Sequence, residues 1–147
     1  MLHVLSNEFI QEQIHKCREK ISIRDYDGAI TNARSLVEEV LKEILKKASN
    51  EEPKNNGKLN NLYNEAKKVL NLTKKDTYAR PLLKLLEGLG LIVDGLADLS
   101  NNMSDRHARK YTPHKHHAKL AVNTALIFSD FLFESWDYQK QSNKKTV

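Results

Sequence analysis

The sequence has few of the residues that define small secreted or metal-bound domains. Only one of its 147 residues, Cys17, is a cysteine, which excludes an internal disulfide and a cysteine-rich zinc module. A single cysteine is typical of a reducing compartment, and free cysteines are commonly buried as small apolar residues. We therefore expect Cys17 to lie in the core and the protein to be cytoplasmic.

Glycine and proline are also scarce, with five and three residues, and no long apolar run is present. The mostly apolar stretch 1–5 is too short for a secretory signal and is followed directly by Asn7 and Glu8. The most apolar region, 82–99, is interrupted by four charged side chains. These features exclude a membrane span and predict no membrane association.

The charge balance is mildly basic. Lysine and arginine number 24 against 19 acidic residues, which gives a net charge of +5 in a chain that is 39% hydrophobic. This composition is ordinary for a folded domain. The positive charge permits an anionic partner but does not require one, because many helical surfaces are mildly basic.

Apolar residues recur at helical spacing almost throughout, and no strand-like alternation is present. The pattern predicts five helices, at about 7–22, 28–48, 59–72, 78–99 and 118–136. Short connections favour an all-α antiparallel up-and-down bundle with the second, fourth and fifth helices as its core. We expect one domain over 1–138 and a polar tail over 139–147.

Two local features carry further expectations. Ser6 is suited to cap the first helix. Gly88, Gly90 and Gly95 interrupt the fourth helix, where each costs about 1 kcal/mol relative to alanine. Three such costs predict a kink or the close approach of a neighbouring backbone.

After Ser100 the apolar pattern stops, and a polar stretch runs to His117. Histidines and cations are interleaved here: His107, His114, His116 and His117 with Arg106, Arg109, Lys110, Lys115 and Lys119. One interpretation is a metal site, because imidazole is a common zinc ligand. However, the sequence has no HExxH motif and the neighbouring cations oppose a divalent ion, so we expect neither a metal nor another cofactor.

Two other interpretations remain. In the first, Arg109, Lys110, Lys115 and Lys119 pair with phosphates while Tyr111 stacks on a base, as in single-stranded RNA binding. In the second, the segment is a solvated basic turn whose histidines satisfy groups at the helix ends. The segment alone does not separate these two.

The phrase HHAKLAVNTALIFSDFLFESW at 116–136 follows a leucine-rich helix and a polar turn. It resembles the abortive-infection C-terminal family, whose helical domain is similar to the HEPN domains of bacterial defence and toxin systems. The segment DYDGAITNARSLVEEVLKEIL at 25–45 fits the second helix of that family. The resemblance implies a HEPN-like bundle. Tyr26, Arg34 and Glu38 in this segment are weaker candidates to line a binding pocket of that bundle.

The family signature is an arginine, usually followed by asparagine, with a histidine a few residues later. Alignment on Leu99 and on the fifth helix puts Ser100 at the arginine position, Asn101 at the asparagine and His107 at the histidine. In ribonuclease members the histidine assists transfer of the 2′-hydroxyl proton and the arginine stabilises charge on the phosphate, without a metal. Ser100 cannot supply that charge, and Ala108 replaces a frequent glycine.

Family sites are commonly formed by two subunits, so the resemblance implies a homodimer in which a partner's Arg106 enters a shared pocket. Arg109 and His114 also reproduce the signature spacing, but they lie across Pro113 and we interpret that match as chance. We predict an abortive-infection or phage-defence domain that binds RNA through 107–119. Whether a homodimer of this domain also cleaves RNA without a metal stays an open question, because the signature arginine is missing. The alternative is a non-catalytic dimerisation or protein-interaction module of a defence or toxin–antitoxin system.

Overall fold

The structure is a computed structural model that describes residues 2–51, 53, 58–73, 80–104 and 112–145, with side chains over 8–98 and 112–141 of these ranges. The described residues form five α-helices and no strand: α1 (Leu2–Ser22), α2 (Tyr26–Ser49), α3 (Leu59–Val69), α4 (Arg80–Ser104) and α5 (Lys115–Lys145). The predicted all-α, five-helix fold class is confirmed. Because α1 begins at Leu2, Ser6 lies inside it and is not its cap.

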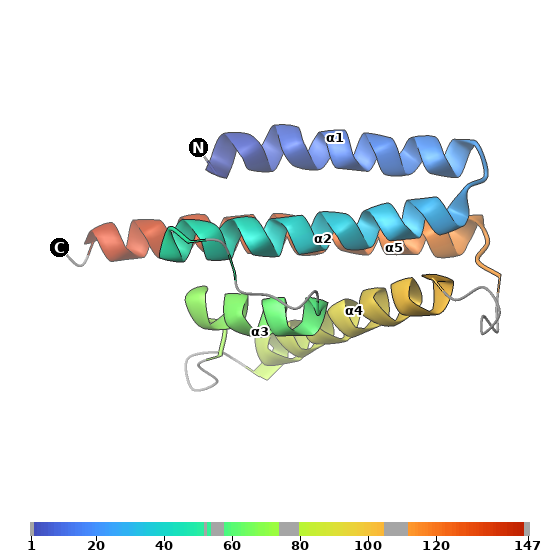
Figure 1. Ribbon diagram of the computed structural model, residues 1–147. Coiled ribbons are helices and arrows are strands. Elements are labelled where there is room, and N and C mark those ends of the chain that lie inside the picture. Colours follow the sequence, from blue (N-terminus) through green and yellow to red (C-terminus); the bar gives the residue numbers. More distant parts are fainter. Residues whose placement is uncertain (1, 52, 54–57, 74–79, 105–111, 146–147) are drawn as a thin grey trace.

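Helices α2 and α5 lie side by side, with α1 on one side of them and α3 and α4 on the other (Figure 1). Helix α1 is antiparallel to α2, and α4 is antiparallel to α5, as expected. Helices α2, α3 and α5 run in the same direction (Figure 1). The first turns of α2 and α5 therefore lie at the same end of the molecule as the last turns of α1 and α4. Helix α5 also continues through residues 139–145 of the expected tail.

The core is centred on α2, which contributes nine buried residues between Ala29 and Leu45. Helix α5 supplies Phe128 and Leu132, which are fully buried, and α1 supplies a buried stripe that includes Cys17. The prediction that α4 belongs to the core was wrong for most of that helix. Among its described residues only Val93 and Leu96 are buried, while Leu82, Leu85 and Leu91 are exposed. Periodicity identifies an apolar face but not whether a neighbouring helix covers it.

The glycines of α4 do not mark close backbone packing. A Cβ atom added to Gly88 or Gly95 would meet no atom within 4 Å, and one added to Gly90 would meet only the Tyr63 ring at 4.0 Å. The expected close approach of a neighbouring backbone is therefore wrong at all three positions. Gly88 and Gly95 face open space, and Gly90 faces the ring of Tyr63.

The turn between α1 and α2 is fixed by hydrogen bonds at both helix ends. The Asp25 N–H donates to the Lys20 carbonyl at 2.8 Å, and the Arg24 N–H donates to the Ile21 carbonyl at 3.0 Å. This pattern terminates α1 with Arg24 in the left-handed conformation, at φ 64°. Asp25 then caps α2 by accepting a hydrogen bond from the Gly28 N–H at 2.9 Å.

Phe128 provides the sharpest test of this core. It is fully buried, and its ring meets the Tyr63 ring edge-on at a centroid distance of 5.3 Å. Replacement of Phe128 by Ala should lower the free energy of unfolding by about 3–5 kcal/mol because it leaves a cavity. The neighbouring Ile127 is 63% exposed, so Ile127→Ala should change it by less than about 0.5 kcal/mol. Urea unfolding measures the free energy of unfolding of both variants. Equal losses in Phe128→Ala and Ile127→Ala would contradict the placement of α5.

Candidate nucleic-acid interface

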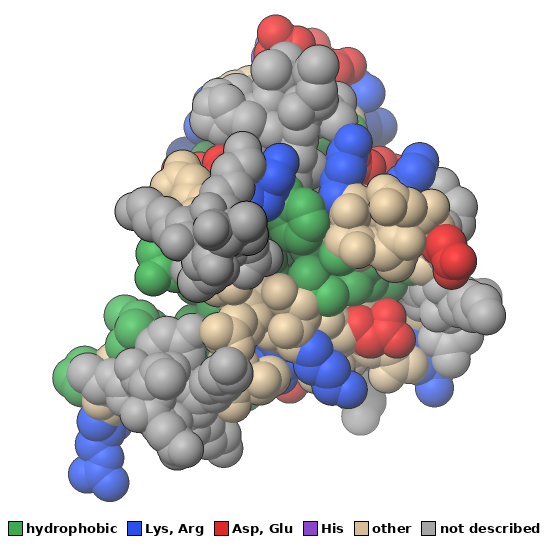
Figure 2. Space-filling model, turned by 90° about the vertical axis from the view of Figure 1, so that its left-hand side faces the viewer, with side chains coloured by type: hydrophobic (Ala, Val, Ile, Leu, Met, Phe, Trp, Pro, Cys, Tyr) green, Lys and Arg blue, Asp and Glu red, His purple; other side chains and the backbone are tan. Residues whose placement is uncertain are grey.

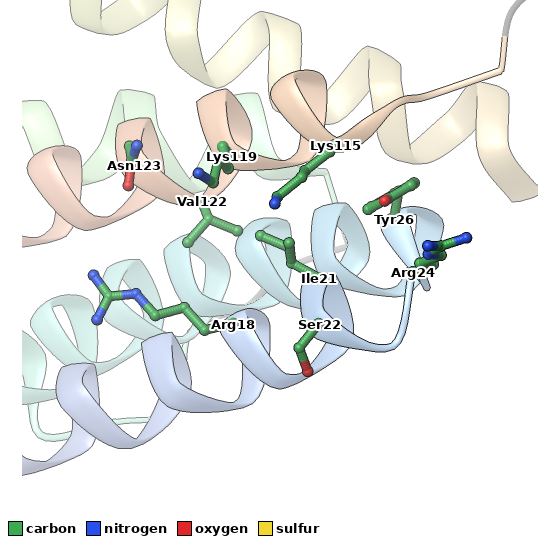
Figure 3. Close-up of a pocket in the computed structure, with 9 residues that line it drawn as sticks. All are labelled: Arg18, Ile21, Ser22, Arg24, Tyr26, Lys115, Lys119, Val122 and Asn123. Atoms are coloured by element: carbon green, nitrogen blue, oxygen red, sulfur yellow. The ribbon is translucent and has the colours of Figure 1, made fainter.

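An open cleft of about 670 Å³ lies where the end of α1, the α1–α2 turn and the first turns of α5 meet. Ile21 and Val122, which are buried, belong to its apolar part. The side chains drawn in Figure 3 line it: Arg18, Ile21, Ser22, Arg24, Tyr26, Lys115, Lys119, Val122 and Asn123. The cleft is within the size range of small-ligand sites.

Four of the lining side chains are cations: Arg18, Arg24, Lys115 and Lys119. Within the described residues, none of the four lies within 4.0 Å of a carboxylate. The adjacent Asp25 is already engaged, since its carboxylate caps α2 and lies 3.5 Å from the Lys20 ammonium group. The cleft therefore concentrates positive charge that described acidic side chains do not neutralise, which favours an anionic ligand.

The first turn of α5 adds to this positive field. It contains no acidic residue and begins with Lys115, His116 and His117. Acidic side chains are favoured at a helix N-terminus because the macrodipole is positive there. Cations at that end lower the stability of α5, and a bound phosphate would offset the cost through both the cations and the helix end.

The histidines of this turn cap the helix. The His114 backbone N–H donates to His117 Nδ1 at 3.0 Å, and the His114 carbonyl accepts from the Ala118 N–H at 3.1 Å. His117 thus does what glutamate does in a capping box. Its ring centroid lies 4.0 Å from that of His116 and 5.8 Å from that of His114. Partial desolvation, followed by these two neighbouring imidazoles, holds the pKa of His117 below its usual value.

An apolar groove of about 560 Å³ lies between α4 and the other side of α5. Leu120 is 64% exposed at this groove. The groove is lined by Ile30, Ile92, Gly95, Leu96, His117, Leu120, Ala121 and Thr124. The first turns of α5 therefore contribute to a basic cleft on one side and an apolar groove on the other.

The opposite end of the bundle differs from the cleft. Figure 2 views the molecule from the side where α1 begins and α5 ends. Hydrophobic atoms are visible there among charged side chains of both signs, lysine and arginine as well as aspartate and glutamate. The lining of the cleft, by contrast, includes four cations and no carboxylate among the described residues.

The structure brings two of the predicted RNA-binding residues, Lys115 and Lys119, into the cleft together with Tyr26. Ser100 and Asn101 lie in the last turns of α4, but their side chains are not described. Five predicted site residues lie outside the described part of the chain: Arg106, His107, Arg109, Lys110 and Tyr111.

Three other side chains have structural roles. Arg34 pairs with Glu38 at 2.6 Å, one turn apart on α2, and neither lines the cleft. Burial alone would raise the pKa of Glu38, but hydrogen bonds and charges from Lys42 and Arg34 lower it below its usual value.

Cys17 is fully buried, and burial raises the pKa of its thiol to about 11, which makes it a poor nucleophile.

The sequence prediction missed Arg18 and Arg24. Arg24 and Arg18 are 91 and 97 positions from Lys115 along the chain. Helical periodicity within a segment does not indicate which distant helix end lies opposite. The one local signal was the RDYD segment at 24–27, where a cation precedes an aspartate suited to cap a helix. That signal locates a turn but not a binding surface.

The fold and the cleft together define an all-α domain with a basic concave site at one end. A family model of HEPN-like domains, Abi_C, matches residues 8–136. The chain therefore belongs to the Abi_C family of HEPN-like domains, as the resemblance at 25–45 and 116–136 predicted. No curated protein and no solved structure matches the chain.

The described residues hold neither a membrane-spanning helix nor a cluster of metal ligands. No helix in the described ranges is both long and apolar enough to cross a membrane. Over the same residues, histidine, cysteine and acidic side chains form no group of three or more that could hold a metal ion. The three neighbouring histidines at 114, 116 and 117 therefore do not form such a group.

The His117 cap should make the start of α5 sensitive to pH. Because the pKa of His117 lies below its unfolded value of about 6.5, the folded state binds fewer protons just below that pH. Its contribution to stability is therefore present above about pH 6.5 and lost as the pH falls. Amide hydrogen exchange of Ala118, corrected for intrinsic rates, should be faster near pH 5.5 than near pH 7.5.

The matched variant is His117→Gln, whose side-chain oxygen accepts the same hydrogen bond without titrating. It should remove most of the pH dependence while leaving exchange near pH 7.5 unchanged. If the variant kept the full pH dependence of the wild type, His117 would not be the responsible group.

Proposed function

We propose that this protein is an abortive-infection domain that binds RNA through the basic segment 107–119. The supporting observation is the chemistry at the start of α5. Lys115 and Lys119 line a concave site with four cations that no described carboxylate pairs, at a helix end without acidic residues. Phosphate contacts from such cations account for most sequence-independent affinity for nucleic acid.

The family signature adds a chemical step to this binding. His107 takes part in transfer of the 2′-hydroxyl proton, and Asn101 lies at the preceding signature position. Ser100 stands where the family has arginine, so Arg106 of a second subunit supplies the charge that stabilises the phosphate. This arrangement requires a homodimer and no metal.

The test of catalysis compares wild type with His107→Ala on a labelled structured RNA, such as a tRNA, in EDTA. The wild type should cut the RNA, and the variant should cut it about a hundred- to ten-thousandfold more slowly because a general acid–base group is lost. Lys140→Ala, on an exposed turn of α5 away from the cleft, is the control and should cut normally. Absence of cutting, or equal cutting by wild type and His107→Ala, would contradict a catalytic role for His107.

A second candidate function is favoured by the apolar groove. In this alternative the domain is a non-catalytic dimerisation module of a defence or toxin–antitoxin system, and its groove is covered by a second copy of the chain. Leu120, which is 64% exposed at the groove, is the type of side chain that an interface buries.

Light scattering at about micromolar concentration tests this dimer. The wild type should be a dimer and Leu120→Asp a monomer, because a charge would be buried in the interface. Leu85→Asp, which is also exposed on α4 but does not line the groove, is the control. A monomeric wild type would contradict both the dimerisation module and the shared catalytic pocket.

A further inference from the structure

The proposed function assigns RNA contacts to one wall of the cleft, the α5 side. The other wall, from α1 and the α1–α2 turn, carries Arg18, Arg24 and Tyr26. Arg18 and Arg24 lie toward opposite ends of the cleft, and Lys115 and Lys119 lie between them on the facing helix (Figure 3). The positive charge is therefore spread along the cleft rather than focused on one point.

This distribution fits a chain of phosphates better than a single anion. Lys115 and Lys119 are one turn apart, about 6 Å along the helix axis, and the two arginines extend the row in both directions. Between the charges the cleft is lined by the apolar side chains of Ile21 and Val122, and Tyr26 lines it at the start of α2 (Figure 3). A cationic row with an apolar and aromatic lining is the combination that holds the backbone and bases of a single strand.

The backbone of Arg24 supplies an independent observation. Three non-glycine residues in the described chain have positive φ: Arg24, Asn50 and Asn71. Asparagine tolerates the left-handed conformation, whereas arginine is disfavoured there relative to glycine. A long cation thus occupies a helix end that glycine or asparagine would fill with less strain, and its side chain lines the cleft. Residues kept in unfavourable conformations are concentrated at functional sites.

We propose that the cleft between α1 and α5 is the binding track for single-stranded RNA, with Arg18 and Arg24 as phosphate contacts opposite Lys115 and Lys119 and with Tyr26 as a surface for a base. This proposal rests on the proposed RNA-binding function. It adds that the α1 wall of the cleft also contacts phosphates and that the bound RNA is single-stranded. A base can stack on Tyr26 only where it is unpaired and unstacked, which a duplex does not offer.

The test uses fluorescence polarisation of a 5′-labelled single-stranded RNA, with a fully paired RNA duplex as competitor. Arg24→Gly is the central variant, because it removes the cation while relieving the left-handed backbone. It should bind about tenfold more weakly, with a smaller salt dependence, while its thermal midpoint is no lower than that of wild type. Arg18→Gln should weaken binding to a similar degree.

Lys16→Gln is the matched control. Lys16 lies on α1, two residues from Arg18, pairs with Glu12 at 3.6 Å and does not line the cleft. It should bind RNA within about twofold of wild type, a difference of less than about 0.5 kcal/mol. The duplex should compete at least tenfold less well than the unlabelled single strand.

The outcomes separate this proposal from the one on which it rests. If wild type binds RNA and Lys115→Gln weakens it, but Arg24→Gly and Arg18→Gln do not, RNA binding stands and the α1 wall is overturned. If Lys16→Gln weakens binding as much as Arg24→Gly, general charge rather than the cleft is responsible, and the track is overturned. Equal competition by the duplex overturns the single-strand assignment. A wild type that binds no RNA overturns both proposals.

Discussion

The structure depends on the parallel packing of α2 against α5. Both helices bury a long apolar stripe in the same core, with Val37 and Leu41 of α2 and Phe128 and Leu132 of α5 fully buried. Burial on this scale is the main favourable contribution to folding. Because the two helices run in the same direction, their positive N-terminal ends lie together. The hairpin from α1 to α2 then brings the last turn of α1 to that same end.

The chemistry of the domain follows from this geometry. Helix α5 begins with lysine and histidine where acidic residues are usual, which lowers its stability at neutral pH and more so in acid. The His114–His117 hydrogen bond caps the helix without adding the negative charge of a glutamate. The start of α5 is therefore held in place while its positive field remains available to a ligand. On the other side of the same turns, Ile92, Gly95 and Leu96 of α4 line an apolar groove together with α5.

Much of the fold could be predicted from the sequence, because helical spacing in 28–48 and 118–136 is nearly unbroken and the family phrase covers the same segments. The place of α4 could not. Its leucine stripe is as regular as that of α2, and exposure depends on which neighbours pack against it. The three glycines were misleading for the same reason, since local sequence cannot distinguish close packing from open space.

The candidate site was predicted in part. Lys115 and Lys119 were identified because cations are dense in their segment, and the structure places both in the cleft. Arg18 and Arg24 were missed because their own surroundings are those of an ordinary helix end, and only the turn from α1 to α2 brings them opposite α5. The signature positions near His107 depend on the family resemblance, and their geometry lies outside the described residues.

The most direct test of the central claim, that RNA binds where α2 and α5 begin, is an NMR titration of isotope-labelled protein with a short single-stranded RNA. Backbone amide shifts should be concentrated in 18–26 and 115–123, the two walls of the cleft. The α4 face around Leu91 and the far end of α5 should be unaffected. Shifts confined to the groove or the far end, or no shifts at RNA concentrations of about a millimolar, would contradict the account.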